Sequence, residues 1–271
     1  MSEQSILITG GTGKFGRIFV AHFFKKGWQV LFTTTSKERG DSLIASLSGN
    51  LNIYTANNSE STANNKVVND RLIALVVDLT EDNVAPKLVE TIENKGYKVN
   101  HLVNNARSLD FLQTDDNGQA KRDDFMAEYL MDVVVPYELS MALFNTQADA
   151  LRTITNIGSQ YGVVAANPQL YDDPLKSSPI QYGVAKAALM HLTKELAVRL
   201  ADSNVRVNCV AYGGVEGRVD DAFKARYAKL TPSRRMLAEN DIIGPLDLLI
   251  SASARAINGQ TIQADDGWTL W

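Results

Sequence analysis

The chain has 271 residues, 45% of them hydrophobic, and a formal net charge of −4 at pH 7. This length accommodates one large α/β domain or two small ones, and the mild negative charge gives no reason to expect nucleic acid or an anionic membrane as a partner. The single cysteine, Cys209, excludes an internal disulfide and a Cys-x-x-Cys metal site, and the three scattered histidines form no metal-ligand pattern.

Features that would direct the chain to a membrane are missing from the sequence. No apolar run approaches the roughly 20 residues that span a bilayer, and Met1 to Gln4 lead into a strand signal without a basic or long apolar leader. A lone cysteine fits a reducing compartment. We therefore expect a cytoplasmic protein without a membrane partner.

The first two predicted elements are a strand at 5–9 and a helix at 14–26, joined by a turn dense in glycine. Glycines let the backbone approach a pyrophosphate, and the helix N-terminus offers free N–H groups to that anion. A glycine pattern alone is weak evidence for a dinucleotide site. We call residues 9–16 the glycine corner; its candidate cofactor-binding residues are Gly10, Gly13, Lys14, Phe15 and Gly16.

Strand and helix signals alternate through the rest of the chain, apart from an Asn-rich stretch at 49–71 that we expect to be a surface loop or short hairpin. Seven strands separated by helices predict a single Rossmann-type doubly wound α/β domain over 1–271, with a parallel sheet and helices on both faces. The further strands are expected at 29–34, 72–77, 99–103, 152–157, 205–211 and 260–264, and the further helices at 38–48, 83–95, 122–148, 181–201 and 239–252.

Two helices carry local signals that concern their shape. Thr80 and Asp82 are the candidate N-caps of helix 83–95. Pro136 lies inside the long helix 122–148, where its missing N–H favours a bend. The residues 159–180 and 212–240 are expected to be mainly loop, with a short helix in the second segment.

Ligands of doubly wound sheets bind at the carboxyl ends of the strands, so the residues after each strand are the site candidates. After the second strand stand Thr35, Ser36 and Lys37, followed by Arg39, and no acidic residue is there to pair with a ribose diol. Hydroxyls and cations suit a 2′-phosphate, so we favour NADP(H), with NAD(H) as the alternative. A solvated helix start is the competing interpretation.

The third and fourth strands are followed by groups that suit an adenosine and a flat ring. Asp78-Leu79 could hold adenine, although Asp78 could equally cap a helix. Asn105 can tie neighbouring strand ends together, and Ala106 leaves room for a flat ligand.

After the fifth strand come Ser159 and, on the next predicted helix, Tyr182 and Lys186, which share one helix face. An ordinary tyrosine has a pKa near 10, and a nearby ammonium favours the phenolate. With Ser159 on the substrate oxygen, the three residues can polarise a carbonyl that accepts hydride from a nicotinamide. An isolated Tyr-x-x-x-Lys is usually a surface pair; its place behind a glycine corner and a strand-ending Gly-Ser reverses that interpretation.

Over nearly its whole length, the chain resembles the short-chain dehydrogenase/reductase family. The resemblance implies that Tyr182 is the general acid/base, that Lys186 binds the nicotinamide ribose, that Ser159 orients the substrate, and that helices such as 181–201 build a homodimer or homotetramer. The matching motifs occur in the family's order: Thr9-Gly10 with Gly16, Asp78-Leu79, Asn104-Asn105-Ala106, Ser159, Tyr182-Gly-Val-Ala-Lys186, Arg206-Val207-Asn208 and Asn258-Gly259-Gln260 with Asp265-Asp266-Gly267.

The chain departs from the family pattern at four positions. Lys14 stands where the compact branch usually has glycine and could bring a cation to the cofactor phosphates, and Arg107 replaces the glycine after Asn-Asn-Ala. Asp132 replaces the asparagine that is often counted as a fourth catalytic residue. Tyr212 with Gly213 replaces Pro-Gly, close to Val215, whose amide would contact the carboxamide.

The substrate signals point to a redox reaction on a carbonyl/alcohol pair. Tyr182 follows Ser159 by 23 positions, more than is usual in the compact branch, so loop 163–180 with Tyr171, Asp172 and Asp173 is a candidate substrate wall. The long loop, the Tyr-Gly-Val-Val-Ala run after Ser159 and the Asp-Asp-Gly ending resemble those of short-chain dehydrogenases in bacterial surface-sugar pathways, including flagellin and lipopolysaccharide modification. This resemblance makes a sugar-related substrate the first expectation and a 3-oxoacyl thioester the second. Cations that could meet an anionic substrate are Arg107, Arg218, Lys224, Arg226, Arg234 and Arg235.

Two other classes of function stay open. A sugar-nucleotide dehydratase or epimerase with tightly held NAD(P) is favoured by the glycine spacing and the long Ser–Tyr gap, but the chain ends soon after the seventh strand. A cofactor-sensing binding protein is disfavoured, because a sensor has no need of the Ser/Tyr/Lys trio.

Overall fold

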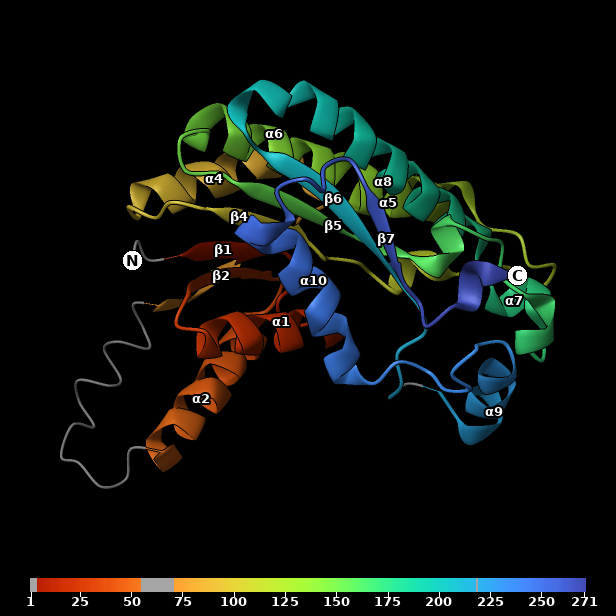
Figure 1. Cartoon of the computed structure of the whole chain (residues 1–271). Coiled ribbons are helices and arrows are strands. Elements are labelled where there is room, and N and C mark those ends of the chain that lie inside the picture. Colours follow the sequence, from red (N-terminus) through yellow and green to blue (C-terminus); the bar gives the residue numbers. More distant parts are fainter. Residues whose placement is uncertain (1–3, 55–70, 218) are drawn as a thin grey trace.

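The computed structural model describes residues 4–54, 71–217 and 219–271. Its centre is a seven-stranded sheet in the order β3-β2-β1-β4-β5-β6-β7, with every neighbouring pair parallel (Figure 1). This arrangement confirms the predicted doubly wound α/β fold. The strands are β1 (Ser5–Ile8), β2 (Gln29–Thr34), β3 (Leu72–Val76), β4 (His101–Asn104), β5 (Thr153–Ser159), β6 (Arg206–Tyr212) and β7 (Thr261–Ala264).

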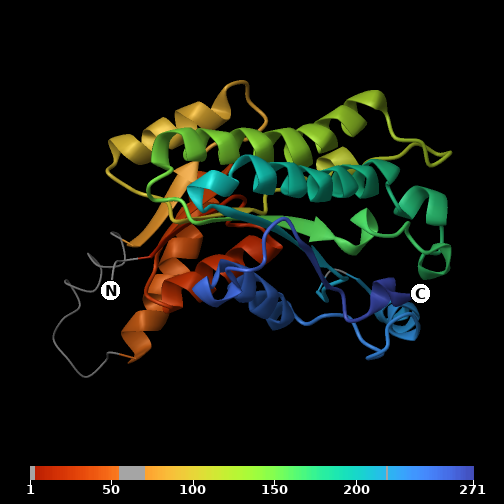
Figure 2. The same cartoon turned by 45° about the horizontal axis from the view of Figure 1, so that its top comes forward.

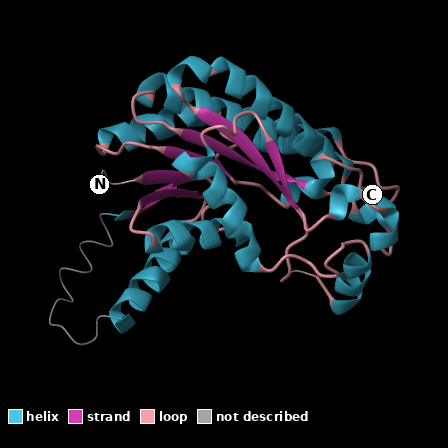
Figure 3. Cartoon of the chain, viewed as in Figure 1, coloured by secondary structure: helices cyan, strands magenta, loops and turns pink. Residues whose placement is uncertain are grey.

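Helices cover both faces of the sheet, as Figures 2 and 3 show. Helices α4, α6 and α8 lie over one face, and α1, α2 and α10 lie over the other. The helices on the two faces are α1 (Lys14–Lys25), α2 (Lys37–Tyr54), α4 (Val84–Asn94), α6 (Val135–Gln147), α8 (Ile180–Arg199) and α10 (Ile243–Ile250).

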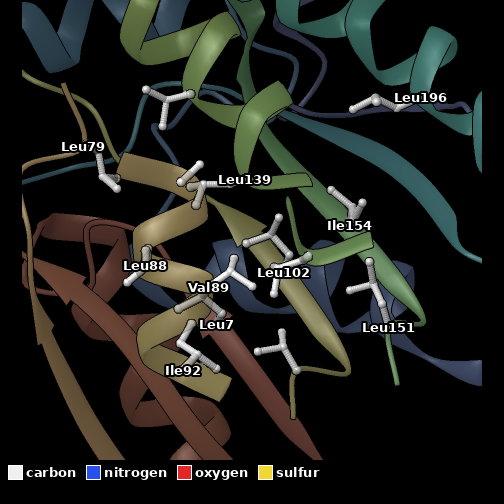
Figure 4. Packing of buried hydrophobic residues seen from close by; sticks show 14 of the residues in the cluster. Leu7, Leu79, Leu88, Val89, Ile92, Leu102, Leu139, Leu151, Ile154 and Leu196 are labelled. Atoms are coloured by element: carbon white, nitrogen blue, oxygen red, sulfur yellow. The ribbon is translucent and has the colours of Figure 1, made fainter. Parts of the chain in front are cut away.

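The alternation of side chains along each strand creates two separate cores. On β1, Leu7 points into the core under α4, α6 and α8, whereas its neighbours Ile6 and Ile8 point into the core under α1, α2 and α10. Figure 4 shows the first of these cores, with Leu7, Leu102 and Ile154 of the strands packed against the helices. Strands buried on both faces are typical of parallel sheets, and they hold the strand ends rigidly in place.

Two predicted boundaries are wrong. The helix expected at 38–48 continues to Tyr54 as α2, so the first residues of the predicted polar loop are helical; Asn and Ser have only mildly unfavourable helix propensities. The remainder of that prediction, residues 55–70, lies outside the described residues. Helix α4 begins at Val84, and its N-cap is Asn83 in the left-handed conformation, φ 57°, rather than Thr80 or Asp82, because Asn tolerates positive φ.

The predicted helix 122–148 is interrupted. It consists of α5 (Arg122–Tyr129), a π-turn at Leu130–Val134 and α6. Pro136 in the first turn of α6 has no N–H to donate to the carbonyl four residues earlier, so the regular α-helical pattern cannot pass through it. The π-turn contains Asp132, and π-turns frequently occur at functional sites.

The long loop after β5 also contains regular structure. Its short helices lie at Gln160–Gly162, Pro168–Leu170 and α7 (Pro174–Ser177), and the segment after β6 contains α9 (Asp221–Lys229). In the parts of the chain that the structure describes, no helix has the length and apolarity needed to cross a bilayer.

Candidate active site

The strand order reverses between β1 and β4, and the segments that leave these two strands diverge there. The Asn105 side-chain amide donates to the Thr9 carbonyl at 2.8 Å, while the Thr9 hydroxyl accepts from the Asn105 and Ala106 N–H groups at 2.8 and 2.9 Å. Asn105 therefore ties the two strand ends together, as predicted, at the point where doubly wound folds bind their ligands.

The glycine corner packs so closely that side chains would not fit. Gly10 has φ +65°, and a Cβ there would lie 2.8 Å from the Ala106 Cα; a Cβ on Gly16 would overlap the Gly10 carbonyl. Gly13 is the N-cap of α1 and brings no side-chain cap. The glycines thus leave the backbone at the start of α1 uncovered by their own side chains, in a cradle that fits a cofactor phosphate.

Lys14 joins the glycine corner to the segment after β6. Its Nζ donates to the Val215 carbonyl at 2.9 Å and also to the Glu216 carbonyl. The ammonium thus lies beside the segment expected to contact the nicotinamide carboxamide. Its predicted role at the cofactor phosphates stays a prediction.

Tyr212, which replaces the family's proline, is firmly held. Its hydroxyl donates to the Ile242 carbonyl at 2.6 Å, and its ring meets the Phe15 ring edge-on, with centroids 5.5 Å apart. Burial raises the pKa of Tyr212. The tyrosine therefore fixes the end of β6 against the start of α1 and the start of α10.

At the end of β2, the Arg39 side chain contacts the residues that follow the strand. Arg39 donates to the Thr35 hydroxyl at 2.8 Å, and its own N–H donates to Ser36 Oγ at 3.2 Å. Lys37 instead pairs with Asp41 on the exposed side of α2. Of the two cations in the predicted phosphate site, Arg39 is thus the one that contacts the predicted hydroxyls.

The residues after β3 support both interpretations of Asp78. Asp78 Oδ1 accepts from the Thr80 N–H at 2.9 Å and from the Thr80 hydroxyl at 2.7 Å, so Asp78 stabilises a local turn. Its side chain is nevertheless exposed. Leu79 is buried in the core, which fixes the backbone beside it.

The predicted proton-transfer residues come together around the start of α8. The Lys186 Nζ lies 5.7 Å from the centroid of the Tyr182 ring, and it donates to Asp132 Oδ1 at 3.0 Å and to the Ile157 carbonyl at 2.9 Å. Burial is the largest single influence on Lys186 and disfavours the ammonium. The negative charge of Asp132, the Tyr182 phenol and the hydrogen bond to Asp132 together outweigh burial and raise the pKa of Lys186. Asp132 thus holds Lys186 in place and keeps it charged.

Ser159 ends β5 directly beside α8. Its hydroxyl accepts from the Tyr161 N–H at 3.2 Å. Gly183, next to Tyr182, allows this turn to approach the helix, because a Cβ there would lie 2.9 Å from the Tyr161 carbonyl oxygen. The close approach brings the Ser159 segment against the helix that carries Tyr182 and Lys186.

Two further charged residues belong to this site, and only Arg107 was considered from the sequence, as a cation that could meet an anionic substrate. Its guanidinium lies over the Tyr182 ring, 4.7 Å from the ring centroid. Glu128 has no exposed surface and lies one helical turn before Asp132. Spacing on α5 could have linked Glu128 to Asp132, but its complete burial depends on how α5 packs against α8.

The segment after β6 is fixed by a tyrosine from α9. Tyr227 accepts from the Gly214 N–H at 2.7 Å and donates to Gln160 Oε1 at 2.9 Å. Gly213 donates its N–H to the Ala264 carbonyl at 3.0 Å, and a Cβ there would lie 2.8 Å from the Asp265 Cα. The predicted contact residues Gly213 and Val215 therefore lie on a tightly held backbone.

The loop after Ser159 is anchored to α9. The Tyr161 and Tyr171 hydroxyls are 2.6 Å apart, and Arg226 donates to the Leu170 carbonyl at 2.7 Å and pairs with Asp172 at 3.1 Å. Burial raises the pKa of both Tyr161 and Tyr171, so their hydroxyls stay protonated. Loop and helix together form a wall next to Tyr182.

Three of the cations that were expected to meet substrate form ion pairs within the chain, and one lies outside the described residues. Arg226 fixes the loop, Lys224 pairs with Asp221 at 3.2 Å, and Arg235 pairs with Asp241 at 2.6 Å. Arg218 lies outside the described residues. Within the described ranges, no group of three or more His, Cys, Asp and Glu side chains could hold a metal ion.

The chain is similar to known reductases and dehydrogenases. A family model for enoyl-(acyl carrier protein) reductase matches residues 15–269. Post-translational flagellin modification protein A of Campylobacter coli is 38% identical over 117 residues, a match that spans 43% of this chain and less than half, 46%, of that relative. The 3-oxoacyl-(acyl-carrier-protein) reductase FabG of Chlamydia pneumoniae is 24% identical over 273 residues, 98% of this chain and 97% of the relative.

Solved structures share the fold. A short-chain dehydrogenase from Leptospira borgpetersenii, solved with bound NAD+, superposes with a TM-score of 0.79 at 24% identity, covering 98% of this chain and 93% of that one.

Proposed function

The chain belongs to the short-chain dehydrogenase/reductase family of NAD(P)-dependent oxidoreductases, and on this premise we propose that it interconverts a carbonyl and an alcohol with NADP(H), using Tyr182 as general acid/base. The observation that carries the proposal is the buried Lys186 ammonium, fixed by Asp132 at 3.0 Å and lying 5.7 Å from the Tyr182 ring. A buried cation at this place has a chemical use, because it stabilises a phenolate.

The cofactor is assigned to the carboxyl ends of the strands. The backbone cradle of the glycine corner fits the pyrophosphate, the exposed Asp78 and the Leu79 backbone suit adenine, and Asn105 and Ala106 line the gap between β1 and β4. The proposed cofactor-binding residues are Gly10, Gly13, Lys14, Phe15, Gly16, Thr35, Ser36, Lys37, Asp78, Leu79, Asn105, Ala106, Tyr182, Lys186, Gly213 and Val215.

The preference for NADP(H) rests on the end of β2. Thr34–Ser36 contains no acidic residue, and the Arg39 guanidinium donates to the Thr35 hydroxyl at 2.8 Å. The Glu38 carboxylate accepts from the Ser36 hydroxyl at 2.7 Å, which is the feature that favours NAD(H). A fork of N–H donors beside hydroxyls suits a phosphate group. NAD(H) is the alternative cofactor.

The proposed proton transfer involves three side chains. When bound, the nicotinamide supplies the hydride that adds to the carbonyl carbon. Tyr182 donates its phenolic proton to the carbonyl oxygen, Ser159 hydrogen-bonds to the same oxygen, and Lys186 stabilises the phenolate that remains. In alcohol oxidation the Tyr182 phenolate takes the hydroxyl proton. Asp132 acts by holding Lys186, so a carboxylate replaces the family's asparagine as a partner of the lysine.

A sugar-related substrate is the first assignment. The wall beside Tyr182 presents the paired hydroxyls of Tyr161 and Tyr171, which suit a polyol, and the flagellin modification relative supports the same class. Arg107 over the Tyr182 ring favours a substrate with an anionic group near the carbonyl. A 3-oxoacyl thioester, as in the name of the FabG relative, is the second assignment.

A binding and turnover screen tests this proposal. NADPH and NADH are titrated separately by quenching of tryptophan fluorescence, and consumption of the reduced cofactor is then followed with phosphosugars, nucleotide sugars, keto sugars and 3-oxoacyl thioesters. We expect tighter binding of NADPH and turnover in one sugar-related class. Tight cofactor binding without turnover in any class would contradict the proposed reaction.

We also propose that the chain is a homodimer or homotetramer. Helix α8 exposes the large apolar side chains Ile180, Val184 and Val198, the last of them 78% exposed, while Leu189 and Leu196 of the same helix are buried against the sheet. Exposed apolar side chains on a helix favour association. Light scattering at micromolar concentration is expected to give the mass of two or four chains, and the mass of one chain would contradict this proposal.

A further inference from the structure

The proton-transfer site contains a buried acid to which the proposed reaction gives no role. Glu128 has no exposed surface, and neither of its carboxyl oxygens has a hydrogen-bond partner within the described chain; the same is true of Asp132 Oδ2. Ionised carboxylate oxygens that are buried without donors are strongly destabilising. A proton on one of the two carboxyls removes most of this cost, because an O–H can then donate to the other carboxyl.

The surrounding charges decide which carboxyl holds that proton. Asp132 Oδ1 receives a hydrogen bond from the Lys186 ammonium at 3.0 Å, which favours its ionised form. Besides Asp132 and Lys186, one more charge acts on Glu128, that of Arg107. Arg107 is exposed, and its guanidinium lies over the Tyr182 ring. No cation is in hydrogen-bond contact with Glu128 among the described residues, so the proton belongs on Glu128.

The titration of Glu128 agrees with this assignment. Burial, followed by the negative charge of Asp132, raises the pKa of Glu128 from 4.5 to about 7, with Arg107 and Lys186 acting in the opposite direction. Two acids that share one site titrate as a pair, and the acid with the poorer ion pair keeps the proton.

We propose that Glu128 is a positioning residue: in its neutral form it donates its proton to Asp132 Oδ2, so that Asp132 presents Oδ1 to Lys186 and holds the ammonium beside Tyr182. This role rests on the proposed function of Tyr182. With Glu128 neutral, the charges of Asp132 and Lys186 balance. Ionisation of Glu128 adds a negative charge to this dry cluster and disfavours the Tyr182 phenolate that alcohol oxidation requires.

The proposal is tested with Glu128→Gln, which keeps a neutral donor, Glu128→Leu, which removes it, and Glu90→Gln as a control that changes an exposed carboxyl on α4. The first readout is the free energy of unfolding without cofactor, measured by urea denaturation across pH 5–8. Folded Glu128 keeps its proton until about pH 7, whereas the unfolded residue loses it near pH 4.5. The Glu128 contribution therefore makes unfolding easier as the pH rises through this interval. Burial lowers the pKa of His101 from 6.5 to about 4, which gives the opposite slope, but it does so equally in every variant, so the difference between the profiles isolates Glu128.

We expect this loss of stability to be absent from Glu128→Gln and present in Glu90→Gln. Resonances of ¹³C-labelled Glu carboxyls are expected to include one group that titrates near pH 7 and disappears in Glu128→Gln. If all Glu carboxyls titrate near their ordinary value, Glu128 is ionised at neutral pH and the proposal is wrong. The same conclusion follows if the unfolding profiles of the wild type, Glu128→Gln and Glu90→Gln have the same dependence on pH. These readouts need no substrate, so they stand even if the proposed reaction fails.

Turnover completes the test once a substrate is known. Glu128→Gln is expected to keep kcat within about threefold and to lose the ionisation near pH 7 from its profile, whereas Glu128→Leu loses about tenfold or more in kcat with little change in cofactor affinity. Glu128→Leu with full turnover would show that Asp132 and Lys186 need no help from Glu128. If Glu128→Leu does not fold, the carboxyl titration and the Glu128→Gln profile still decide the question.

Discussion

The cofactor side and the proton-transfer side of the site are built by different means. The glycine corner consists of backbone: Gly10 at positive φ, the missing Cβ of Gly16, and N–H groups at the start of α1. The proton-transfer side consists of buried ionisable groups, namely Glu128, Asp132 and Lys186, which come from α5, the π-turn and α8. The glycine corner depends on the absence of side chains, and the buried cluster depends on the balance of charge between its groups.

The largest expected effect comes from a substitution that removes the cation of the buried cluster and leaves the glycine corner unchanged. Lys186→Met leaves Asp132 buried without its cation, and we expect a loss of about 3–5 kcal/mol in the free energy of unfolding together with loss of turnover. Urea denaturation measures the first effect. Lys194→Met, on an exposed position of the same helix, is the control and is expected to change stability by less than about 0.5 kcal/mol.

If Lys186→Met and Lys194→Met are equally stable, the cluster is not the dry ion pair described above. A smaller loss in the double variant Lys186→Met with Asp132→Leu than in Lys186→Met alone would confirm that the cost arises from the uncompensated carboxylate.

The corner is expected to fail through sterics rather than charge. Gly10→Val places a β-branched residue at φ +65° and a Cβ 2.8 Å from the Ala106 Cα, so we expect about 100-fold weaker NADPH binding, equivalent to about 2.7 kcal/mol. Fluorescence titration measures it. Gly244→Ala on α10 has open space around its Cβ and is expected to bind NADPH like the wild type. Unchanged binding by Gly10→Val would place the phosphates elsewhere.

The smallest expected effect lies at the edge of the cofactor side. Arg39→Ala is expected to weaken NADPH binding about tenfold and to leave NADH binding unchanged, because a single exposed contact to a phosphate is lost. Lys37→Ala changes a second proposed cofactor-binding cation, and because Lys37 pairs with Asp41 it is expected to weaken NADPH binding less than Arg39→Ala does. If Arg39→Ala weakens the binding of NADPH and NADH equally, Arg39 does not contact the 2′-phosphate.

The same contrast explains what could be predicted from the sequence. Glycine spacing, strand alternation and the Tyr-x-x-x-Lys pair are local signals, and they correctly located seven strands, the glycine corner and the Tyr182–Lys186 face. The tie made by Asn105 between β1 and β4 was also expected from its place after a strand.

Features that depend on distant packing were missed. Nothing near Glu128 in the sequence shows that α5 is buried there, and the interruption before Pro136 was expected as a bend rather than as a π-turn that contains Asp132. The pairing of Arg226 with Asp172 joins residues 54 positions apart, so a cation expected to meet substrate instead fixes the loop. Burial and long-range pairing are tertiary properties that single-residue signals do not contain.

The central claim is that Tyr182 performs the proton transfer, and one measurement tests it most directly. Tyr182→Phe removes a single hydroxyl, and its NADPH affinity and its kcat on the substrate found by screening are compared with those of the wild type. We expect an unchanged Kd within about twofold and a loss of kcat of about 100-fold or more, as befits a general acid/base. A Tyr182→Phe variant with full turnover would contradict the account.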